Sequence, residues 1–275
     1  MDVYKCKISN GYELLSFLKA HYCVGDSASW WWPSFQSKKI KDGIEICGGL
    51  YSSAPNLSFC LASILGQNTR YSNAWTSLIN LYSYFFDMLD SMYSFNRSDV
   101  LAFHNYEYPN LAFISSSKWH DCLLNIICNM NLYTMARLIS SSGFYNQKSH
   151  RIILLSRNIL YDFGGFDRFA REVDRTWLLE QKGIGNESAS SILNYALKRD
   201  EIVVDKYTQK LLASLGHEYI KYEDMQAFLR ENLDNARNLY DFDISLAQIM
   251  ARLHGKIVEH CKRHKIGNFN TINNV

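Results

Sequence analysis

Residues 178–208 read LLEQKGIGNESASSILNYALKRDEIVVDKYT, and this stretch is the most informative part of the chain. A short apolar helix is expected to end before Gly183, and a second helix to begin after Gly185. Glycines allow a tight turn and leave backbone N–H groups uncovered, and N–H groups at a helix N-terminus attract a phosphate. Asp205 follows the second helix after a short apolar run. The pattern therefore predicts a segment that binds a nucleic-acid backbone and holds one carboxylate at a fixed distance from it.

The composition suits a helical protein and leaves the kind of partner open. The chain has 275 residues, enough for one large domain or two small ones, and 47% of them are hydrophobic. Only 3 prolines and 14 glycines occur, which favours helices. The formal net charge is +2, so any basic surface for an acidic partner must be local.

Hydrophobic periodicity predicts helices along most of the chain and no alternating strand pattern longer than a few residues. The expected fold class is therefore all-α. Residues 34–56 and 95–118 lack a helical period, and we expect a surface loop and an irregular connection there. Outside the hairpin, the expected helices span residues 11–22, 57–68, 71–90, 119–140, 148–162, 166–175, 206–215, 222–232 and 243–264.

The cysteines and the lack of long apolar runs indicate in which cellular compartment the protein is expected. The 7 cysteines are odd in number and show no C-x-x-C spacing, so we expect reduced cysteines in a cytoplasmic protein. No signal-peptide pattern opens the chain, and no apolar run approaches the length of a membrane span.

The hairpin and Asp205 together resemble the helix–hairpin–helix motif with downstream aspartate of the endonuclease III superfamily of DNA glycosylases. Further segments resemble the bacterial 3-methyladenine DNA glycosylases of that superfamily: residues 30–33 (WWWP), 67–71 (QNTRY), 143–148 (GFYNQK) and 245–259 (SLAQIMARLHGKIVE). The similarity covers most of the chain, and residues 34–56 and 88–130 look like insertions.

The resemblance implies two helical lobes with a DNA-binding cleft between them. One lobe would comprise residues 57–197 with the hairpin, and the other would combine residues 1–56 with residues 198–275. Trp31 and Asp205 would then face each other across the cleft.

Asp205 can be interpreted as a helix cap or as a catalytic group. An aspartate before Lys-Tyr-Thr-Gln-Lys is a good helix start. Its position after the hairpin favours catalysis, because a carboxylate there can stabilise positive charge on a sugar and orient or deprotonate the attacking water. The two roles are compatible, since one oxygen can cap the helix while the other faces the sugar.

Glu187 occupies a position where a different residue would change the reaction. By the resemblance, bifunctional members of the superfamily carry a nucleophilic lysine at this place, which forms a Schiff base with the opened sugar. A carboxylate cannot form an imine, so strand cleavage should be absent. Glu187 could polarise a water, hold the hairpin, or simply be a solvated glutamate.

The tryptophans at positions 30–32 are either a core plug or a binding wall. A flat aromatic wall suits an extrahelical purine, since stacking contributes about 1–3 kcal/mol per base. A positively charged base adds a cation–π term of about 0.5–2 kcal/mol. By the resemblance, Trp31 and Tyr71 would sandwich the flipped base, and Trp32 and Pro33 would shape its pocket. The family has a phenylalanine where Tyr71 stands, which alters the polarity of the pocket.

The remaining DNA contacts are also implied by the resemblance. Gln67 would fill the gap left by the flipped base, and Phe144, in the loop that contains Asn146, would enter as an apolar wedge beside the orphaned base. The alternatives are a polar residue at a helix end and a core aromatic. Phosphate contacts would come from the backbone near Glu187 and from a set of loop and hairpin residues: Asn146, Lys148, Lys182, Gly183 and Gly185.

No cofactor is expected to be required. The superfamily hairpin often holds a monovalent cation through main-chain oxygens, which here would belong to Leu179, Gln181 and Ile184, and the cation would strengthen the field at the phosphate. An iron–sulfur cluster needs four cysteines in the C-terminal segment, but only Cys261 follows Asp205.

The helix at 243–264 carries a lysine and three histidines of interest. Lys256 lies on its apolar stripe, so it either snorkels to solvent or is buried and partly deprotonated beside the base, where carbon dioxide could modify it. His260 and His264 share a face, and two ligands make a metal site improbable. With His254, they are interpreted as part of a solvated basic helix that faces DNA.

The function expected from these features is hydrolysis of the N-glycosidic bond of alkylated, cationic purines, chiefly 3-methyladenine, in base excision repair. The partner would be double-stranded DNA with an alkylated base, bound by a monomer. Two alternatives are a bifunctional glycosylase and lyase for oxidised pyrimidines, and a non-catalytic DNA-binding module that reuses the hairpin.

Overall fold

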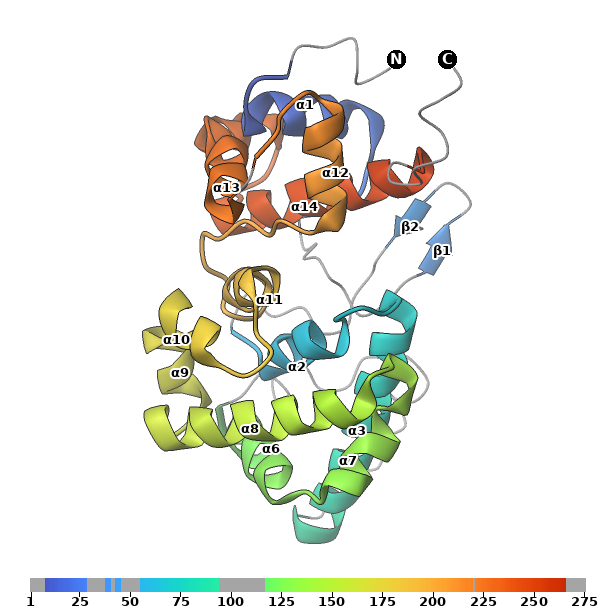
Figure 1. The fold of residues 1–275 in the computed structure, drawn as a ribbon, viewed down its shortest axis with the longest axis vertical. Coiled ribbons are helices and arrows are strands. Elements are labelled where there is room, and N and C mark those ends of the chain that lie inside the picture. Colours follow the sequence, from blue (N-terminus) through green and yellow to red (C-terminus); the bar gives the residue numbers. More distant parts are fainter. Residues whose placement is uncertain are drawn as a thin grey trace. The chain divides into compact units, whose positions relative to one another are not determined.

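The computed structural model describes residues 8–28, 38–40, 43–45, 55–93, 117–219 and 221–265, and these ranges are overwhelmingly helical (Figure 1). The all-α prediction is confirmed. The described elements also include one antiparallel pair inside the segment expected to be a loop, β1 (Lys38–Ile40) and β2 (Gly43–Glu45). None of the described helices combines the length and apolar character needed to cross a bilayer.

The chain divides into two compact units. The first, which we call the discontinuous unit, comprises Met1–Cys47 and Arg199–Val275, and the second, the central unit, comprises Gly48–Lys198. Cysteines of both units are free thiols, namely Cys23, Cys60, Cys122, Cys128 and Cys261 among the described residues.

The helices of the central unit surround a core that contains Tyr82, Phe85 and Trp119, all fully buried. The hydroxyls of Tyr82 and Ser58 are hydrogen-bonded inside this core. The elements are α2 (Leu57–Leu65), α3 (Tyr71–Tyr93), α6 (Ser117–Asn129), α7 (Leu132–Leu138), η2 (Ser140–Ser142), α8 (Tyr145–Phe163), α9 (Phe166–Glu172), α10 (Arg175–Glu180), α11 (Asn186–Ser191) and the π-helical turn η3 (Ile192–Ala196).

Side-chain caps set several of these helix starts. The Asn131 side chain accepts a hydrogen bond from the backbone N–H of Tyr133 at 2.8 Å, so the helix expected over 119–140 is divided into α6 and α7. The Asp174 side chain accepts from the N–H of Trp177 at 2.7 Å and begins α10. Asx residues therefore determine where the hairpin helix starts.

The discontinuous unit packs its helices around α14, which is buried along nearly its whole length. Its helical elements are α1 (Gly11–His21), α12 (Lys206–Ser214), α13 (Tyr222–Arg230), the 3₁₀ segment η4 (Leu233–Leu239) and α14 (Leu246–Arg263). Gly11 allows α1 to approach α13 closely, because a Cβ at this position would lie 1.8 Å from the carbonyl oxygen of Leu229. A capping box between Ser245 and Gln248 begins α14.

Candidate active site

The expected hairpin is present within the central unit. Helix α10 ends at Glu180 and α11 begins at Asn186, with Gly185 as its N-cap. Gly183 has φ +82°, a left-handed conformation that favours glycine. The Arg151 side chain covers this turn so closely that a Cβ on Gly183 would lie 2.2 Å from the Arg151 Nε atom. A side chain at position 183 would therefore be strained by the backbone conformation, and the Arg151 side chain would have to move to admit it.

Gln67 holds the hairpin turn from the C-terminal side of α2. Its Nε2 atom donates hydrogen bonds to the carbonyl oxygen of Gly183 and to Ser188 Oγ, both at 2.9 Å. Arg151 Nη1 donates to Gln67 Oε1 at 2.7 Å. In this structure Gln67 and Arg151 therefore support the turn, and an insertion of Gln67 into DNA would require its amide to leave these partners.

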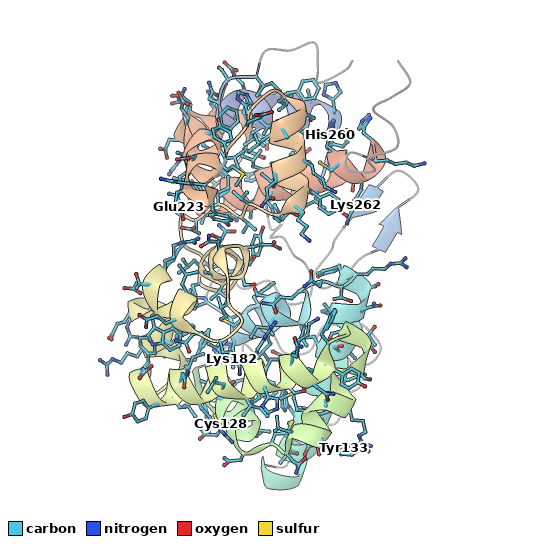
Figure 2. The ribbon with its side chains drawn as sticks, viewed as in Figure 1. Cys128, Tyr133, Lys182, Glu223, His260 and Lys262 are labelled. Atoms are coloured by element: carbon cyan, nitrogen blue, oxygen red, sulfur yellow. The ribbon has the colours of Figure 1, made fainter. Side chains whose placement is uncertain are left out.

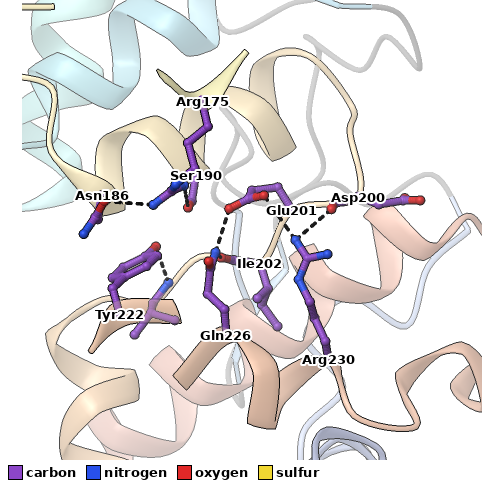
Figure 3. Close-up of polar contacts among 10 residues, drawn as sticks. Arg175, Asn186, Ser190, Asp200, Glu201, Ile202, Tyr222, Gln226 and Arg230 are labelled. Carbon is purple, nitrogen blue, oxygen red and sulfur yellow. Dashed lines mark hydrogen bonds and ion pairs between the residues drawn. The ribbon is translucent and has the colours of Figure 1, made fainter. Parts of the chain in front are cut away.

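Arg175 joins the two helices of the hairpin (Figure 3). Its Nη1 atom donates to Ser190 Oγ at 2.8 Å, and its Nη2 atom donates to Asn186 Oδ1 at 3.0 Å. The arginine begins α10 and both acceptors lie on α11, so the angle between the helices is set by a bidentate side chain. Sequence reasoning did not single out this arginine.

Most of the expected DNA contacts of the central unit are exposed. Phe144 is 62% exposed and adopts the left-handed conformation, with φ +47°, at the start of α8. Asn146 in the same turn, Lys182 in the hairpin (Figure 2) and Glu187 in the first turn of α11 are exposed as well. The interpretation of Phe144 as a core aromatic is excluded.

Lys148 requires a correction. The side chain is 1% exposed, and its Nζ atom donates to the carbonyl oxygens of Leu65 at 2.8 Å and Ser142 at 2.7 Å. Burial, aided by the charge of Arg151, lowers the pKa of Lys148 to about 8. The prediction of a direct phosphate contact was wrong because the ammonium group is used inside the protein, where it fixes the loop that carries Phe144.

Asp205 lies in the discontinuous unit as the N-cap of α12. Its Oδ1 atom accepts hydrogen bonds from the backbone N–H and the hydroxyl of Thr208, at 2.8 and 2.9 Å. Its Oδ2 atom lies 3.3 Å from His254 Nε2. Burial raises the pKa of Asp205, but the charge and hydrogen bond of His254, together with the two bonds from Thr208, outweigh it and leave the pKa below its usual range.

The segment that leads to Asp205 is held by one face of α13 (Figure 3). Gln226 Nε2 donates to the carbonyl oxygen of Ile202 at 2.7 Å and to a carboxylate oxygen of Glu201 at 2.6 Å. The backbone N–H of Val204 donates to the Tyr222 hydroxyl at 3.1 Å. One turn further, Arg230 Nη2 donates to the carbonyl oxygen of Asp200 and to Glu201. We call Tyr222, Gln226 and Arg230 the α13 clamp.

The polar side chains of α14 also differ from expectation. Lys256 is fully buried, and its Nζ atom donates to the Tyr22 carbonyl oxygen and lies 2.9 Å from Asp26 Oδ1. Burial lowers the pKa of Lys256, while Asp26 opposes this shift. The snorkelling alternative is therefore wrong. The contacts suit an ammonium ion, because a carbamate would place a second negative charge beside Asp26.

The histidines of α14 are not solvated as a group. His254 is 2% exposed and His260 is 3% exposed, so the expected solvated basic face does not include them. The Tyr22 hydroxyl lies 2.8 Å from His260 Nδ1 and 3.1 Å from His264 Nε2. Within the described ranges, no group of three or more His, Cys, Asp or Glu side chains is placed to bind a metal ion.

The expected base pocket is only partly described. Trp31, Trp32 and Pro33 lie outside the described residues. Tyr71 is the first residue of α3 and is 37% exposed, so its ring is accessible.

The main-chain oxygens proposed to hold a monovalent cation fit that task chemically. Leu179 lies in the last turn of α10, where carbonyl groups lack an intrahelical donor. The carbonyl oxygen of Gln181 accepts the N–H of Ile184 at 3.0 Å and retains a second lone pair. Carbonyl oxygens are suitable ligands for hard cations. A cation bound by Leu179, Gln181 and Ile184 would supply positive charge beside the hairpin N–H groups.

Comparison with solved structures places this architecture among helical DNA glycosylases. The chain matches the H. pylori 3-methyladenine DNA glycosylase MagIII, solved with bound 1,N6-ethenoadenine, at 36% identity and a TM-score of 0.69, over 93% of this chain and 98% of that one. A thermostable thymine-DNA glycosylase shares the fold, at 12% identity and a TM-score of 0.50, over 92% of this chain and 89% of that one.

Sequence comparison agrees with the structural one. A Methanocaldococcus jannaschii protein named as a DNA repair glycosylase is 32% identical over 158 residues, 54% of this chain and 67% of that protein. Endonuclease III of Thermotoga maritima is 32% identical over 79 residues, 29% of this chain and 35% of that protein. No family model matches the chain. The chain belongs to the endonuclease III superfamily of DNA glycosylases, in the 3-methyladenine DNA glycosylase branch.

Proposed function

We propose that the protein hydrolyses the N-glycosidic bond of alkylated, positively charged purines, chiefly 3-methyladenine, in duplex DNA. It would act as a monomer and leave an abasic site. The observation that carries the proposal is the Asp205 carboxylate, which is ionised and fixed by Thr208 and His254, in a chain that matches MagIII over nearly its whole length.

The reaction needs no proton donor from the protein at the leaving base. A cationic purine leaves with the electron pair of the glycosidic bond and becomes neutral, so no general acid is required. Positive charge then develops on the deoxyribose, and an oriented carboxylate can stabilise it. Water adds to C1′ as the base departs, and its proton passes to Asp205 or to solvent. Asp205 is thus the proposed catalytic residue.

DNA binding and the reaction outcome depend on the hairpin. Backbone N–H groups near Gly183 and Gly185 and the exposed ammonium of Lys182 would contact the phosphates. Phe144 would enter the duplex, where an apolar side chain offsets the unstacking cost of about a few kcal/mol. Glu187 stands at the place of the lyase nucleophile and offers no amine, so the product strand should remain intact.

Base release from methylated DNA tests the proposal. Wild-type protein and an Asp205→Asn variant are incubated with dimethyl sulfate-treated DNA, and free 3-methyladenine is measured chromatographically. Asparagine keeps the N-cap acceptor but removes the charge, so the variant should bind DNA and release base at least 100-fold more slowly. Folded wild-type protein that releases no 3-methyladenine would reject the substrate, and a wild-type rate in the variant would remove Asp205 from the mechanism.

Two further measurements test the absence of strand cleavage and the monomeric state. Borohydride should trap no covalent adduct on lesion-containing DNA, since an adduct requires an amine nucleophile; a trapped adduct would establish the bifunctional alternative. Light scattering should give the mass of one chain for the free protein, and the mass of one chain plus one duplex for the complex with DNA.

A further inference from the structure

His254 is a buried titratable side chain beside the carboxylate that the mechanism uses. It lies near the middle of α14 and is 2% exposed. Its Nε2 atom is 3.3 Å from Asp205 Oδ2, while Asp205 Oδ1 is occupied by Thr208. The two oxygens of Asp205 are thus held from different helices, Oδ1 by α12 and Oδ2 by α14.

We propose that His254 is a positioning residue that orients Asp205 Oδ2 for the reaction through its Nε2–H group. This inference rests on the proposed glycosylase function. Nε2 carries a proton, because an unprotonated nitrogen would present its lone pair to the carboxylate oxygen. The tautomer is thereby fixed, and the imidazole is enclosed by protein, since His254 is 2% exposed.

The contacts of Thr208 and His254 leave one acceptor position of the Asp205 carboxylate open for water or the sugar. An ionised carboxylate has about four lone-pair sites. Among the described residues, Thr208 fills two and His254 a third. The remaining position on Oδ2 has a single direction, so a water or the sugar ring meets the carboxylate in one geometry. Without His254 the plane of the carboxylate could rotate about the cap, and misplacement by about 1 Å can cost roughly 100-fold in rate.

Other charged and titratable groups near Asp205 do not substitute for this contact. Cys261 lies about two turns further along α14. Its Sγ atom donates to the Tyr207 carbonyl oxygen at 3.5 Å, and its pKa is raised to about 12 by burial and then by Asp205. A neutral thiol offers no charge to the carboxylate. The charge of Lys210, which lies on the exposed face of α12, lowers the pKa of Cys261 and so opposes the effect of burial. Among the residues that the structure describes, His254 is therefore the group that holds Oδ2 in place.

Three substitutions test the proposal. His254→Gln retains a donor at the reach of Nε2, His254→Asn retains an amide that is too short, and His254→Leu removes the donor. We measure single-turnover release of 3-methyladenine from methylated DNA, the dissociation constant for the same DNA, and thermal unfolding. Glu223→Gln, at an exposed position on α13 of the same unit, is the control.

We expect the rate of base release to fall in the variants that lack a donor at the position of Nε2, and the affinity for DNA to stay the same in all variants. His254→Leu and His254→Asn should react about 30- to 100-fold more slowly, with unchanged DNA affinity, whereas His254→Gln should stay within about 3-fold of wild type. Loss of His254 raises the pKa of Asp205, so the acid limb of the rate profile should move to higher pH in His254→Leu. A purely structural role would change thermal unfolding and leave this limb in place.

Each outcome decides the proposal. Equal rates in the Gln, Asn and wild-type proteins, or an unmoved acid limb, would overturn it. If His254→Leu fails to fold, the ratio of the Gln to the Asn rate still decides, because these amides differ only in reach. Failure of the glycosylase function itself is distinct, since the wild-type protein would then release no base and no variant comparison would arise.

Discussion

The Nζ atom of Lys256 lies 2.9 Å from Oδ1 of Asp26, and the lysine is fully buried. A lysine on the apolar stripe of a helix is thus retained in its charged form by a carboxylate that remains 32% exposed. The Tyr22 carbonyl oxygen accepts a second hydrogen bond from the same ammonium. The pair connects α14 to the loop that follows α1.

Replacing Lys256 with methionine should destabilise the discontinuous unit. The Tyr22 carbonyl group would lose its buried donor, and leaving such a group unsatisfied costs about 1–3 kcal/mol. Lys19→Met is the control, because Lys19 Nζ lies 4.0 Å from the same Asp26 oxygen but is partly exposed, and such pairs contribute about 0–1 kcal/mol. Urea unfolding should separate the two variants, and equal effects would contradict a stabilising role for the buried pair.

Lys148 and Lys182 should affect different properties. Lys148→Met removes two hydrogen bonds to buried carbonyl oxygens and should lower the free energy of unfolding by about 2–3 kcal/mol. Lys182→Met should leave stability unchanged and weaken DNA binding, because its side chain is exposed at the hairpin. Denaturant unfolding and fluorescence anisotropy with a DNA duplex measure the two quantities. A stability loss at position 182 without an affinity loss would reverse the assignment.

The pH dependence of stability should reveal Lys148. Its pKa is about 8 in the folded protein and about 10.4 in an unfolded chain. Between these values the unfolded chain binds more protons than the folded one, so stability rises with pH. The wild-type protein should therefore gain stability from about pH 8 to about pH 10 relative to Lys148→Met. Parallel curves for the two proteins would argue against a lowered pKa.

Gly183→Ala should damage the hairpin, whereas Gly185→Ala should not. The left-handed conformation costs an alanine about 1–2 kcal/mol, and the new Cβ would also displace Arg151. Gly185 has φ −101° and no atom within 4 Å of an added Cβ. Thermal unfolding measures both variants, and Gly183→Ala should cost less stability in an Arg151→Ala background than in the wild-type protein. The clash is absent in that background, whereas loss of the Arg151–Gln67 hydrogen bond is common to both proteins being compared. An equal cost in the two backgrounds would contradict a contribution from Arg151.

The α13 clamp should influence turnover through Asp205. Gln226→Leu leaves the Ile202 carbonyl oxygen without its donor, which should cost about 1–3 kcal/mol and slow base release at saturating DNA. Glu223→Gln on the exposed side of the same helix should match wild type. Single-turnover rates at 25 °C, well below unfolding, compare the two. A normal rate in Gln226→Leu would show that the segment is positioned without the clamp.

The sequence predicted most helices to within a few residues, because their apolar spacing is regular and their caps are Asn, Asp or Ser. The break at Asn131 was missed, since a helix-internal asparagine and an N-cap look alike in a periodic segment. The short strands at 38–45 were also missed, as three-residue runs carry no usable alternation.

The site was predictable where a single local pattern specifies it. The glycine turn and the Asp205 cap depend on neighbours in the chain, and both are present. Lys148, Arg151 and His254 depend on partners far away in sequence, so no local signal indicates their contacts. The clamp residues Tyr222, Gln226 and Arg230 recur every four residues, and this stripe beside the apolar stripe of α13 was the available clue.

The assignment of Thr208, His254 and the α13 clamp to the same unit as Asp205 has a consequence for how such enzymes can diversify. Substitutions in residues 48–198 can retune strand affinity while the carboxylate and its supports remain untouched. A hybrid that receives residues 48–198 from a relative should therefore bind duplex DNA with the affinity of that relative. It should cleave the glycosidic bond at the rate of the protein that supplies the discontinuous unit.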